Sequence, residues 1–99
     1  MGACNIEFDL AYKAKKTQIA AAFILEQQEG AYQNGHQEGY SGDFQTVHEV
    51  LYHLDITFDT YEEAHEYCLE NAQKWSNVIA VYYLGNGQVN TLVAGWGAC

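Results

Sequence analysis

Apolar and polar residues alternate at the start of the chain, with the period of two that is typical of a strand with one buried face. The expected inward side chains are Cys4, Ile6, Phe8, Leu10 and Tyr12. Asn5, Glu7 and Asp9 take the outward positions between them. The pattern therefore predicts a first strand followed by a turn at the lysines that come next.

A first helix is predicted after Lys13, Lys15 and Lys16, with Thr17 as its N-cap and a course through Ile19 toward Tyr32. Three consecutive alanines, residues 20–22, favour this helix by intrinsic propensity. Its apolar side is unusually wide because two further large residues follow, Ile24 and Leu25. This width suggests a helix that is covered on more than one side.

A second, amphipathic helix is predicted from residue 61 to 75. Thr60 and Glu63 form a capping box at its start. Its apolar stripe consists of Tyr61, Ala64, His65, Cys68, Ala72 and Trp75. Glutamates recur at every fourth position on another face, at Glu62, Glu66 and Glu70. Because like charges four apart destabilise a helix by about 0.2 to 0.5 kcal/mol per pair, this row requires another explanation, either solubility or a partner.

The region between the two helices contains a turn-rich stretch and then strand-forming residues. Residues 34–43 include three glycines and form a loop. Strand formers then come in two groups, residues 44–51 and 53–58. They form either two strands or one bent strand with a break near residues 52–54.

The last part of the chain is predicted to be a β-hairpin. Residues 78–84 and 89–96 are the two strands, and Asn86-Gly87 is a strong signal for the turn between them. There is no charged residue from Ser76 to Cys99. A hairpin this apolar is either central in the sheet or buried in an oligomer. We favour the centre, since a long exposed edge of this composition would invite pairing with other chains.

These elements predict one small α+β domain that spans residues 1–99. The expected order is β-α-β-(β)-α-β-β, with a mostly antiparallel sheet of four or five strands. We expect both helices to pack on one face of that sheet.

The charges are segregated along the chain. The sequence has 13 carboxylates and four basic residues, all lysines, and a net charge of −9. Between Thr17 and Gln73 there are eleven carboxylates and no basic residue. This composition excludes direct nucleic-acid binding and anionic membranes, and there is no apolar run long enough to span a membrane. Its natural counterpart is a basic protein surface.

The cysteines predict neither a metal site nor a disulfide framework. Cys4, Cys68 and Cys99 have no spacing typical of a zinc site, although His65 and Cys68 share one helical face. Cys68 is expected to be a small core residue. We expect no metal and no cofactor. Since no signal peptide is recognisable, we expect a cytoplasmic location.

The sequence contains only weak signals for catalytic residues. His48 with Glu49, and His53 with Asp55, place imidazoles near carboxylates, but adjacent residues of a strand point to opposite faces. Ser41 lacks the context of a nucleophile elbow. We therefore expect that the chain is not an enzyme.

The glycine-rich loop is a candidate ligand site, because polar and aromatic groups gather there. These residues are His36, Glu38, Tyr40, Ser41 and Asp43. Two of them are carboxylates and the loop has no cation, which argues against phosphate binding. The alternative is a connecting loop whose glycines only satisfy turn geometry.

Four fragments together resemble a family of small uncharacterised proteins of bacteriophages and other mobile elements. They are the opening MGAC, the loop GHQEGYSG at 35–42, Lys74-Trp75, and the closing GWGAC. The chain departs from the family pattern at Gln37, Glu38 and Ser76-Asn77. The resemblance implies a context, since small phage-borne accessory proteins frequently act against host defence systems, but it implies no catalytic residue.

The predicted function is a counter-defence protein that inhibits a host nuclease, such as a CRISPR or restriction complex, by occupying its basic nucleic-acid-binding surface. The predicted partner-binding residues are Asp55, Asp59, Glu62, Glu63, Glu66 and Glu70. Two alternatives remain open. One is an oligomeric sponge that sequesters a nucleotide-like signal at the glycine-rich loop. The other is a phage structural or assembly protein, in which the uncharged C-terminal hairpin would be the interface of a homo-oligomer.

Overall fold

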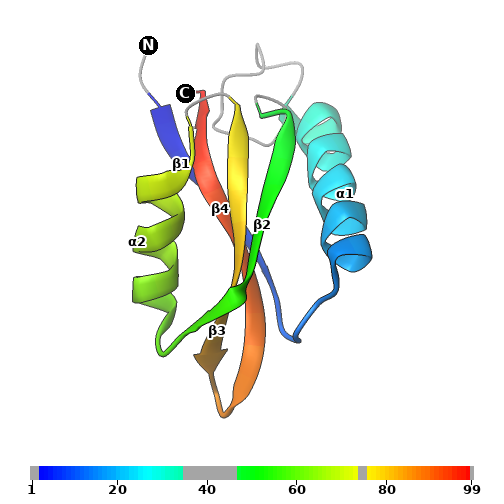
Figure 1. Cartoon of the computed structure of the whole chain (residues 1–99). Helices are drawn as coiled ribbons and strands as arrows, with labels where there is room; N and C mark the ends of the chain where they lie inside the picture. The colour runs from blue at the N-terminus through cyan, green and yellow to red at the C-terminus, as the bar shows by residue number, and fades with distance from the viewer. Residues whose placement is uncertain (1–2, 35–46, 74–75, 99) are drawn as a thin grey trace.

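The chain forms a four-stranded sheet with one helix packed on each face (Figure 1). The computed structural model describes residues 3–34, 47–73 and 76–98. In chain order the elements are β1 (Ala3–Leu10), α1 (Lys16–Asn34), β2 (Glu49–Phe58), α2 (Tyr61–Asn71), β3 (Asn77–Gly85) and β4 (Gln88–Ala98). The predicted α+β class is confirmed.

The strand order is β1-β4-β3-β2, which places the C-terminal hairpin at the centre as predicted. β4 is antiparallel to both β1 and β3. β2 pairs with β3 in parallel, because α2 connects them and returns the chain to the same end of the sheet. The sheet is therefore mostly antiparallel with one parallel edge strand.

The expectation that both helices share one face is wrong. Val78 and Ala80 of β3 lie in the cluster that contains α1 residues, whereas Ile79 and Val81 lie in the cluster that contains α2 residues. A strand that is covered on both faces needs a continuous apolar run rather than an alternating one. Residues 78–83 form such a continuous apolar run, which indicates that both faces of the strand are covered, one helix on each.

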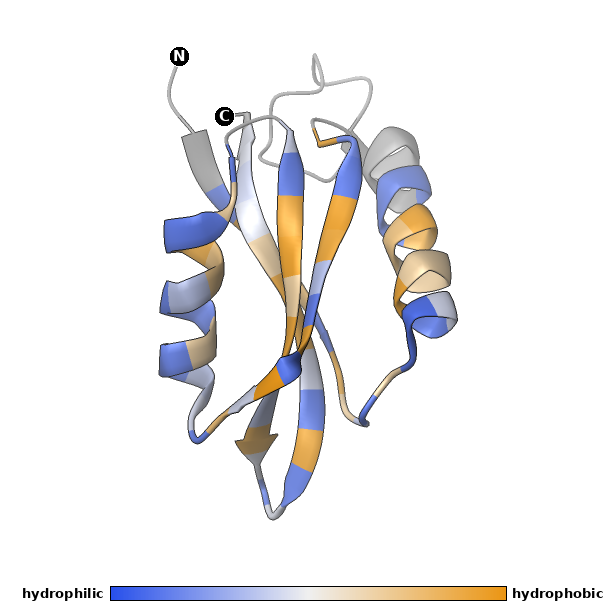
Figure 2. Cartoon of the chain, viewed as in Figure 1, coloured by the Kyte–Doolittle hydropathy of each residue, from blue (hydrophilic) through white to orange (hydrophobic). Residues whose placement is uncertain are grey.

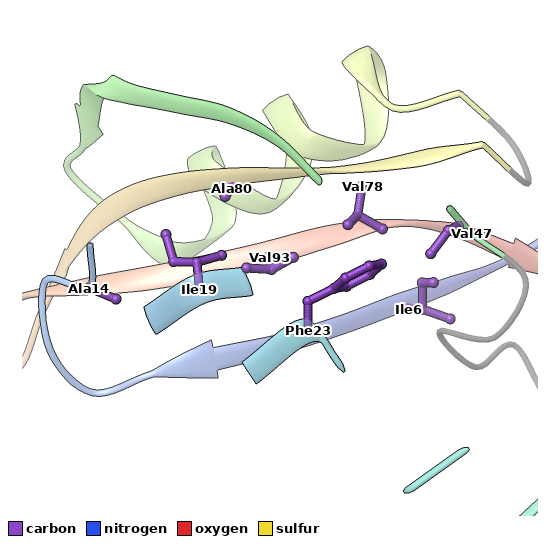
Figure 3. Packing of buried hydrophobic residues seen from close by; sticks show 8 residues of the cluster. All are labelled: Ile6, Ala14, Ile19, Phe23, Val47, Val78, Ala80 and Val93. Carbon is purple, nitrogen blue, oxygen red and sulfur yellow. The ribbon is translucent and has the colours of Figure 1, made fainter. Parts of the chain in front are cut away.

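The core on the α1 side is formed by apolar residues of α1, β1, β3 and β4 and of the two segments that precede α1 and β2 (Figure 3). Its buried members are Ile6, Ala14, Ile19, Phe23, Val47, Val78, Ala80 and Val93. On the α2 side the buried cluster consists of Ala64, Cys68, Ile79, Val81, Tyr83, Leu92 and Ala94. The hairpin contributes to both clusters.

The first strand follows the predicted alternation up to its end. Ile6 is buried, and Phe8 and Leu10 pack against the α1-side core. Tyr12, however, lies beyond the end of β1 and is 47% exposed. Its predicted inward position is therefore wrong, because the strand ends two residues earlier.

The connection from β1 to α1 is held by buried polar contacts. The Ala14 N–H donates to Thr91 Oγ1 at 2.9 Å, and the Tyr82 hydroxyl donates to the Ala14 carbonyl at 2.6 Å. The helix then starts at Lys16, so that its cap is Lys15, two residues before the predicted cap Thr17. The Lys15 N–H donates to Gln18 Oε1 at 2.9 Å, and the Lys15 carbonyl accepts from the Ile19 N–H. A glutamine at the third helical position reaches back to its cap residue, which explains this start.

The strand-forming region before α2 is one bent strand, β2, and not two. Its register against β3 shifts between Tyr52, opposite Ala80, and Thr57, opposite Tyr82. The extra residues on β2 form an irregularity that bends the strand near its lower end in Figure 1. Residues 44–46 of the predicted strand region lie outside the described residues.

The predicted Asn86-Gly87 turn joins β3 and β4. Asn86 has φ 55° and Gly87 has φ 77°, the left-handed values that a two-residue turn of this kind requires.

We expect Gly87→Ala to lower the free energy of unfolding by about 1 to 2 kcal/mol, because alanine disfavours a positive φ. The loss comes from backbone conformation alone, since an added Cβ would meet nothing within 4 Å. Gly87→Asn is the control, since asparagine tolerates this region. Urea denaturation of both variants checks this, and equal losses would contradict it.

Candidate functional site

Helix α2 begins as the sequence predicted and ends earlier. The Glu63 N–H donates to Thr60 Oγ1 at 3.2 Å, which confirms Thr60 as the N-cap. The last helical residue is Asn71, and Ala72 is an extended C-cap whose N–H donates to the Cys68 carbonyl. The helix therefore has three turns and does not reach residue 75.

The inner face of α2 packs on the central strands. Ala64 and Cys68 are fully buried, and the Cys68 thiol donates to the Ile79 carbonyl at 3.4 Å. Burial raises the pKa of the Cys68 thiol to about 12. The thiol is therefore neutral and unreactive, as expected of a core residue.

The outer face of α2 is acidic, and the helix carries hydrophilic bands in Figure 2. Glu62, Glu66 and Glu70 are all exposed, and Glu63 is exposed between them. Because successive residues of a helix are about 100° apart, these four cover the side opposite Ala64 and Cys68. Asp55 and Asp59, which precede the helix, are exposed as well. The six predicted partner-binding residues are thus accessible side chains on α2 and on the chain that leads into it.

The basic residues that the structure describes lie on the other side of the sheet. The Lys13 and Lys16 ammonium groups are each 5.3 Å from an aromatic ring centre, that of Tyr82 and that of Tyr52 respectively. Tyr52 packs against the α1-side core. The separation of charge along the sequence therefore becomes a separation in space, with the sheet between the lysines and the carboxylates of α2.

The structure also shows a polar cluster that the sequence reasoning missed. Glu7 accepts a hydrogen bond from the Tyr61 hydroxyl. Its other carboxylate oxygen lies 2.9 Å from His65 Nε2, an atom that is buried and has no partner in hydrogen-bond geometry. The rings of Tyr61 and His65 are stacked, with their centres 5.5 Å apart. Next to them, the Tyr83 hydroxyl donates to Asp9 Oδ2 at 3.0 Å.

This cluster keeps its phenols neutral. Burial, followed by the hydrogen bond to Asp9, raises the pKa of Tyr83 to about 12. Burial and then the hydrogen bond to Glu7 raise the pKa of Tyr61 well above its usual range. The two phenols therefore donate hydrogen bonds and do not act as bases at neutral pH, so the cluster attaches α2 to β1. Among the described residues, no group of three potential metal ligands lies together.

A sequence signal for this cluster existed in the alternation of β1. Glu7 and Asp9 were assigned to the outward face, and that face would be solvated if both helices packed on the other one. With α2 on this face, the two carboxylates remain exposed but also accept hydrogen bonds from side chains of α2 and β3. The error in helix placement therefore concealed the cluster.

His53 in β2 and His48 just before it do not form the imidazole–carboxylate pairs that were considered for catalysis. His53 Nδ1 lies 2.6 Å from the Tyr67 hydroxyl, and Asp55 is exposed. His48 is exposed, and its backbone N–H donates to the Ser76 carbonyl at 2.8 Å. His53 and Tyr67 thus link β2 to α2 on the side opposite Glu7.

Several predicted residues lie outside the described part of the chain. They include the whole ligand-loop set of His36, Glu38, Tyr40, Ser41 and Asp43, together with Lys74, Trp75 and Cys99. In the described residues no helix is long and apolar enough to cross a membrane.

Comparison of the chain with protein-family models, with curated proteins and with solved structures gave no match.

The position of each glutamate on α2 predicts a different effect on stability. Glu70 lies in the last turn, where a negative charge opposes the helix dipole and no basic residue compensates it. Glu70→Gln should raise the free energy of unfolding by about 0.5 to 1 kcal/mol at low salt. Glu62→Gln is the matched control with the same change of charge: the loss of a favourable first-turn charge offsets the relief of repulsion. Equal effects in urea denaturation would contradict this account.

The raised pKa values predict a loss of stability in alkali. Cys68 and Tyr83 keep their protons up to about pH 12 when folded, but their ordinary pKa values are 9.0 and 10.0. The unfolded chain therefore releases protons first, so their contribution is complete below about pH 9 and is lost as the pH rises through about 12. Tyr83→Phe should make this decline shallower, whereas Tyr12→Phe, at an exposed site, should not. Denaturation at pH 8, 9.5 and 11 checks this, and an unchanged slope for Tyr83→Phe would contradict it.

Proposed function

We propose that the chain is a binding protein that inhibits a host defence nuclease, such as a CRISPR or restriction complex, by placing its acidic surface on the nuclease's basic nucleic-acid-binding surface. The acidic surface consists of Asp55, Asp59, Glu62, Glu63, Glu66 and Glu70. The single observation that carries the proposal is that all six carboxylates are exposed, four of them on α2, while the Lys13 and Lys16 ammonium groups lie over tyrosine rings on the α1 side of the sheet.

The spacing of the glutamates suits a surface that normally binds a nucleic acid. Glu62, Glu66 and Glu70 are four residues apart, which corresponds to steps of about 6 Å along the helix. This is within the range of the distances between phosphates along one strand. A row of carboxylates on a rigid helix offers a partner's lysines and arginines an arrangement comparable to the one that they bind in DNA or RNA.

Stability does not account for this row. Each pair of like charges four apart disfavours the helix, and Glu70 also opposes the helix dipole. A chain selected only for folding would place a basic residue in the last turn. The cost supports a role in which negative charge itself is required, with faster association through long-range attraction as the benefit.

The class of partner comes from the family resemblance and from composition. The chain resembles small proteins of phages and mobile elements, and such accessory proteins frequently act against host defence systems. Such nucleases must hold nucleic acid and therefore present basic channels. The proposed location is the host cytoplasm, where these complexes act.

The structure offers less support to the two alternatives. The sponge hypothesis depends on the glycine-rich loop, which lies outside the described residues. The assembly hypothesis used the uncharged hairpin as a subunit interface, but its apolar residues from Val78 to Val81 and from Leu92 to Ala94 are buried within this chain. Burial in the monomer therefore explains the composition of the hairpin.

The proposal is tested by protection of a phage or plasmid in bacteria that carry a defined CRISPR or restriction system. The chain should restore plaque formation or transformation, and Glu62→Gln combined with Glu66→Gln and Glu70→Gln should abolish the effect. With the purified nuclease, the triple variant should bind at least tenfold more weakly, because three charge contacts are lost, and with a smaller salt dependence.

A matched pair of single variants separates local from overall charge. Glu66→Gln and Glu49→Gln each remove one exposed carboxylate, the first on α2 and the second at the start of β2. Only Glu66→Gln should weaken binding appreciably, and DNA should compete with the chain for the nuclease. Equal effects of the two variants, or binding that DNA does not reduce, would overturn the proposal.

A further inference from the structure

The two edges of the sheet differ in regularity. β1 forms one edge and pairs with β4 from Ala3 to Leu10 without a shift in register. β2 forms the other edge, and its register against β3 shifts between Tyr52 and Thr57. A regular edge strand directs backbone N–H and C=O groups outward, where a further strand can bond to them, whereas a bulged edge resists pairing. β1 is therefore the edge that is suited to accept another strand.

β1 also lacks the other common features that prevent pairing at an edge. Its sequence, ACNIEFDL, contains neither proline nor lysine. Over its eight residues it can offer about four N–H and about four C=O groups along roughly 25 Å. What restricts pairing here is negative charge, because Glu7 and Asp9 are both exposed.

The contacts of these two residues leave their charge in place. Glu7 and Asp9 lie on the α2 face of β1 and accept hydrogen bonds from the hydroxyls of Tyr61 and Tyr83. Burial and these hydrogen bonds raise the pKa of both phenols, so that the phenols are neutral and do not compensate the carboxylates. His65 lies beside Glu7, but among the described residues no lysine forms a salt bridge with either carboxylate.

This charge determines which strand can pair with β1. Pairing of β1 with β1 of a second copy would bring four carboxylates together between two chains of net charge −9, and like charges across strands are destabilising. A strand with basic residues at every second position instead places one of them opposite Glu7 and the next opposite Asp9. Residues directly opposite each other have Cβ atoms about 5 Å apart, which is within reach of an ion pair.

The other face of the same edge is apolar. Phe8 and Leu10 are half-buried and pack against the α1-side core, which contains the buried Ile6. The residues that alternate with the basic ones in an added strand lie on this face, where apolar side chains would cover the remaining surface of Phe8 and Leu10. The β1 edge thus matches a segment in which basic and apolar residues alternate.

We propose that β1 binds an extended segment of a partner protein, with basic and apolar residues in alternation, as a fifth strand of the sheet. The basic side chains lie on the α2 face and the apolar ones on the α1 face. This inference does not depend on the proposed function, because it concerns the backbone edge of β1 and not the carboxylates of α2.

A peptide of about ten residues in which lysine and valine alternate tests the pairing. It should bind the full chain with a dissociation constant below about 1 mM. In hydrogen exchange followed by NMR, every second amide of β1 should exchange more slowly in the complex, whereas the amides of β2 should not change. Absence of binding at about 1 mM, or slower exchange along β2 instead of β1, overturns the proposal.

Two N-methylated forms of this peptide test whether backbone hydrogen bonds are used. The N–H groups of successive residues in an extended strand point to opposite edges, so methylation of all lysines blocks one edge and methylation of all valines blocks the other. One form should bind at least tenfold more weakly than the unmethylated peptide, and the other should bind comparably. Equal binding of the two methylated forms overturns the proposal.

A matched pair of double variants tests the charges. Glu7→Gln combined with Asp9→Asn removes two charges at β1 and keeps an acceptor oxygen for each tyrosine, and it should weaken peptide binding about fivefold. Glu49→Gln combined with Asp55→Asn removes two exposed carboxylates from β2 and should change binding by less than about twofold. Equal effects of the two double variants would show attraction to the overall charge alone and would overturn the proposal.

Discussion

The burial of the β3–β4 hairpin on both faces is the constraint on which the rest of the structure depends. From Ser76 to Cys99 the chain has no charged side chain, and consecutive residues of β3 from Asn77 to Tyr83 are buried. A strand of this kind is stable only if each face is covered and each edge is paired. The other four elements meet these requirements: α1 and α2 cover the faces, and β1 and β2 pair with the edges.

Polar groups around this apolar centre form hydrogen-bonded pairs, buried at Ala14 and closer to the surface on the α2 side, and these pairs hold the outer elements in position. Thr91 and Tyr82 bind the backbone at Ala14 and so fix the start of α1. On the opposite face, Glu7 and Asp9 accept hydrogen bonds from Tyr61 and Tyr83. Trp96 Nε1 donates to the Leu69 carbonyl at 2.8 Å and holds the other end of α2. Since an unpaired buried polar group costs about 1 to 3 kcal/mol, these contacts make the docking of each helix specific.

The two helices present different outer faces. α2 exposes carboxylates at four positions and is anchored on both flanks, through His65 near Glu7 and His53 near Tyr67. Such an element presents charge in a fixed arrangement. α1 exposes Ile24 and Leu25 beside small residues and has lysines at its start. The sheet separates these two outer faces.

The sequence by itself determined the elements that local chemistry specifies. The Asn86-Gly87 turn, the Thr60 cap and the alternation of Ile6, Phe8 and Leu10 depend on residues a few positions apart, and all three were predicted correctly. The exposure of Glu62, Glu66 and Glu70 was also predictable, since it depends only on the period of one helix. The central place of the hairpin followed from its lack of charge.

Only the tertiary structure decided which face each helix covers, because an amphipathic stripe shows that a helix is buried and not against which side of a sheet. The alternation of β1 correctly makes Glu7 and Asp9 exposed, but it does not give their partners Tyr61 and Tyr83, which lie more than fifty residues later in the chain. The choice between two strands and one bent strand, β2, was likewise decided only by the tertiary structure, because the bend depends on the register of β2 against β3. Contacts between distant residues are set by the packing of whole elements, and no local pattern records them.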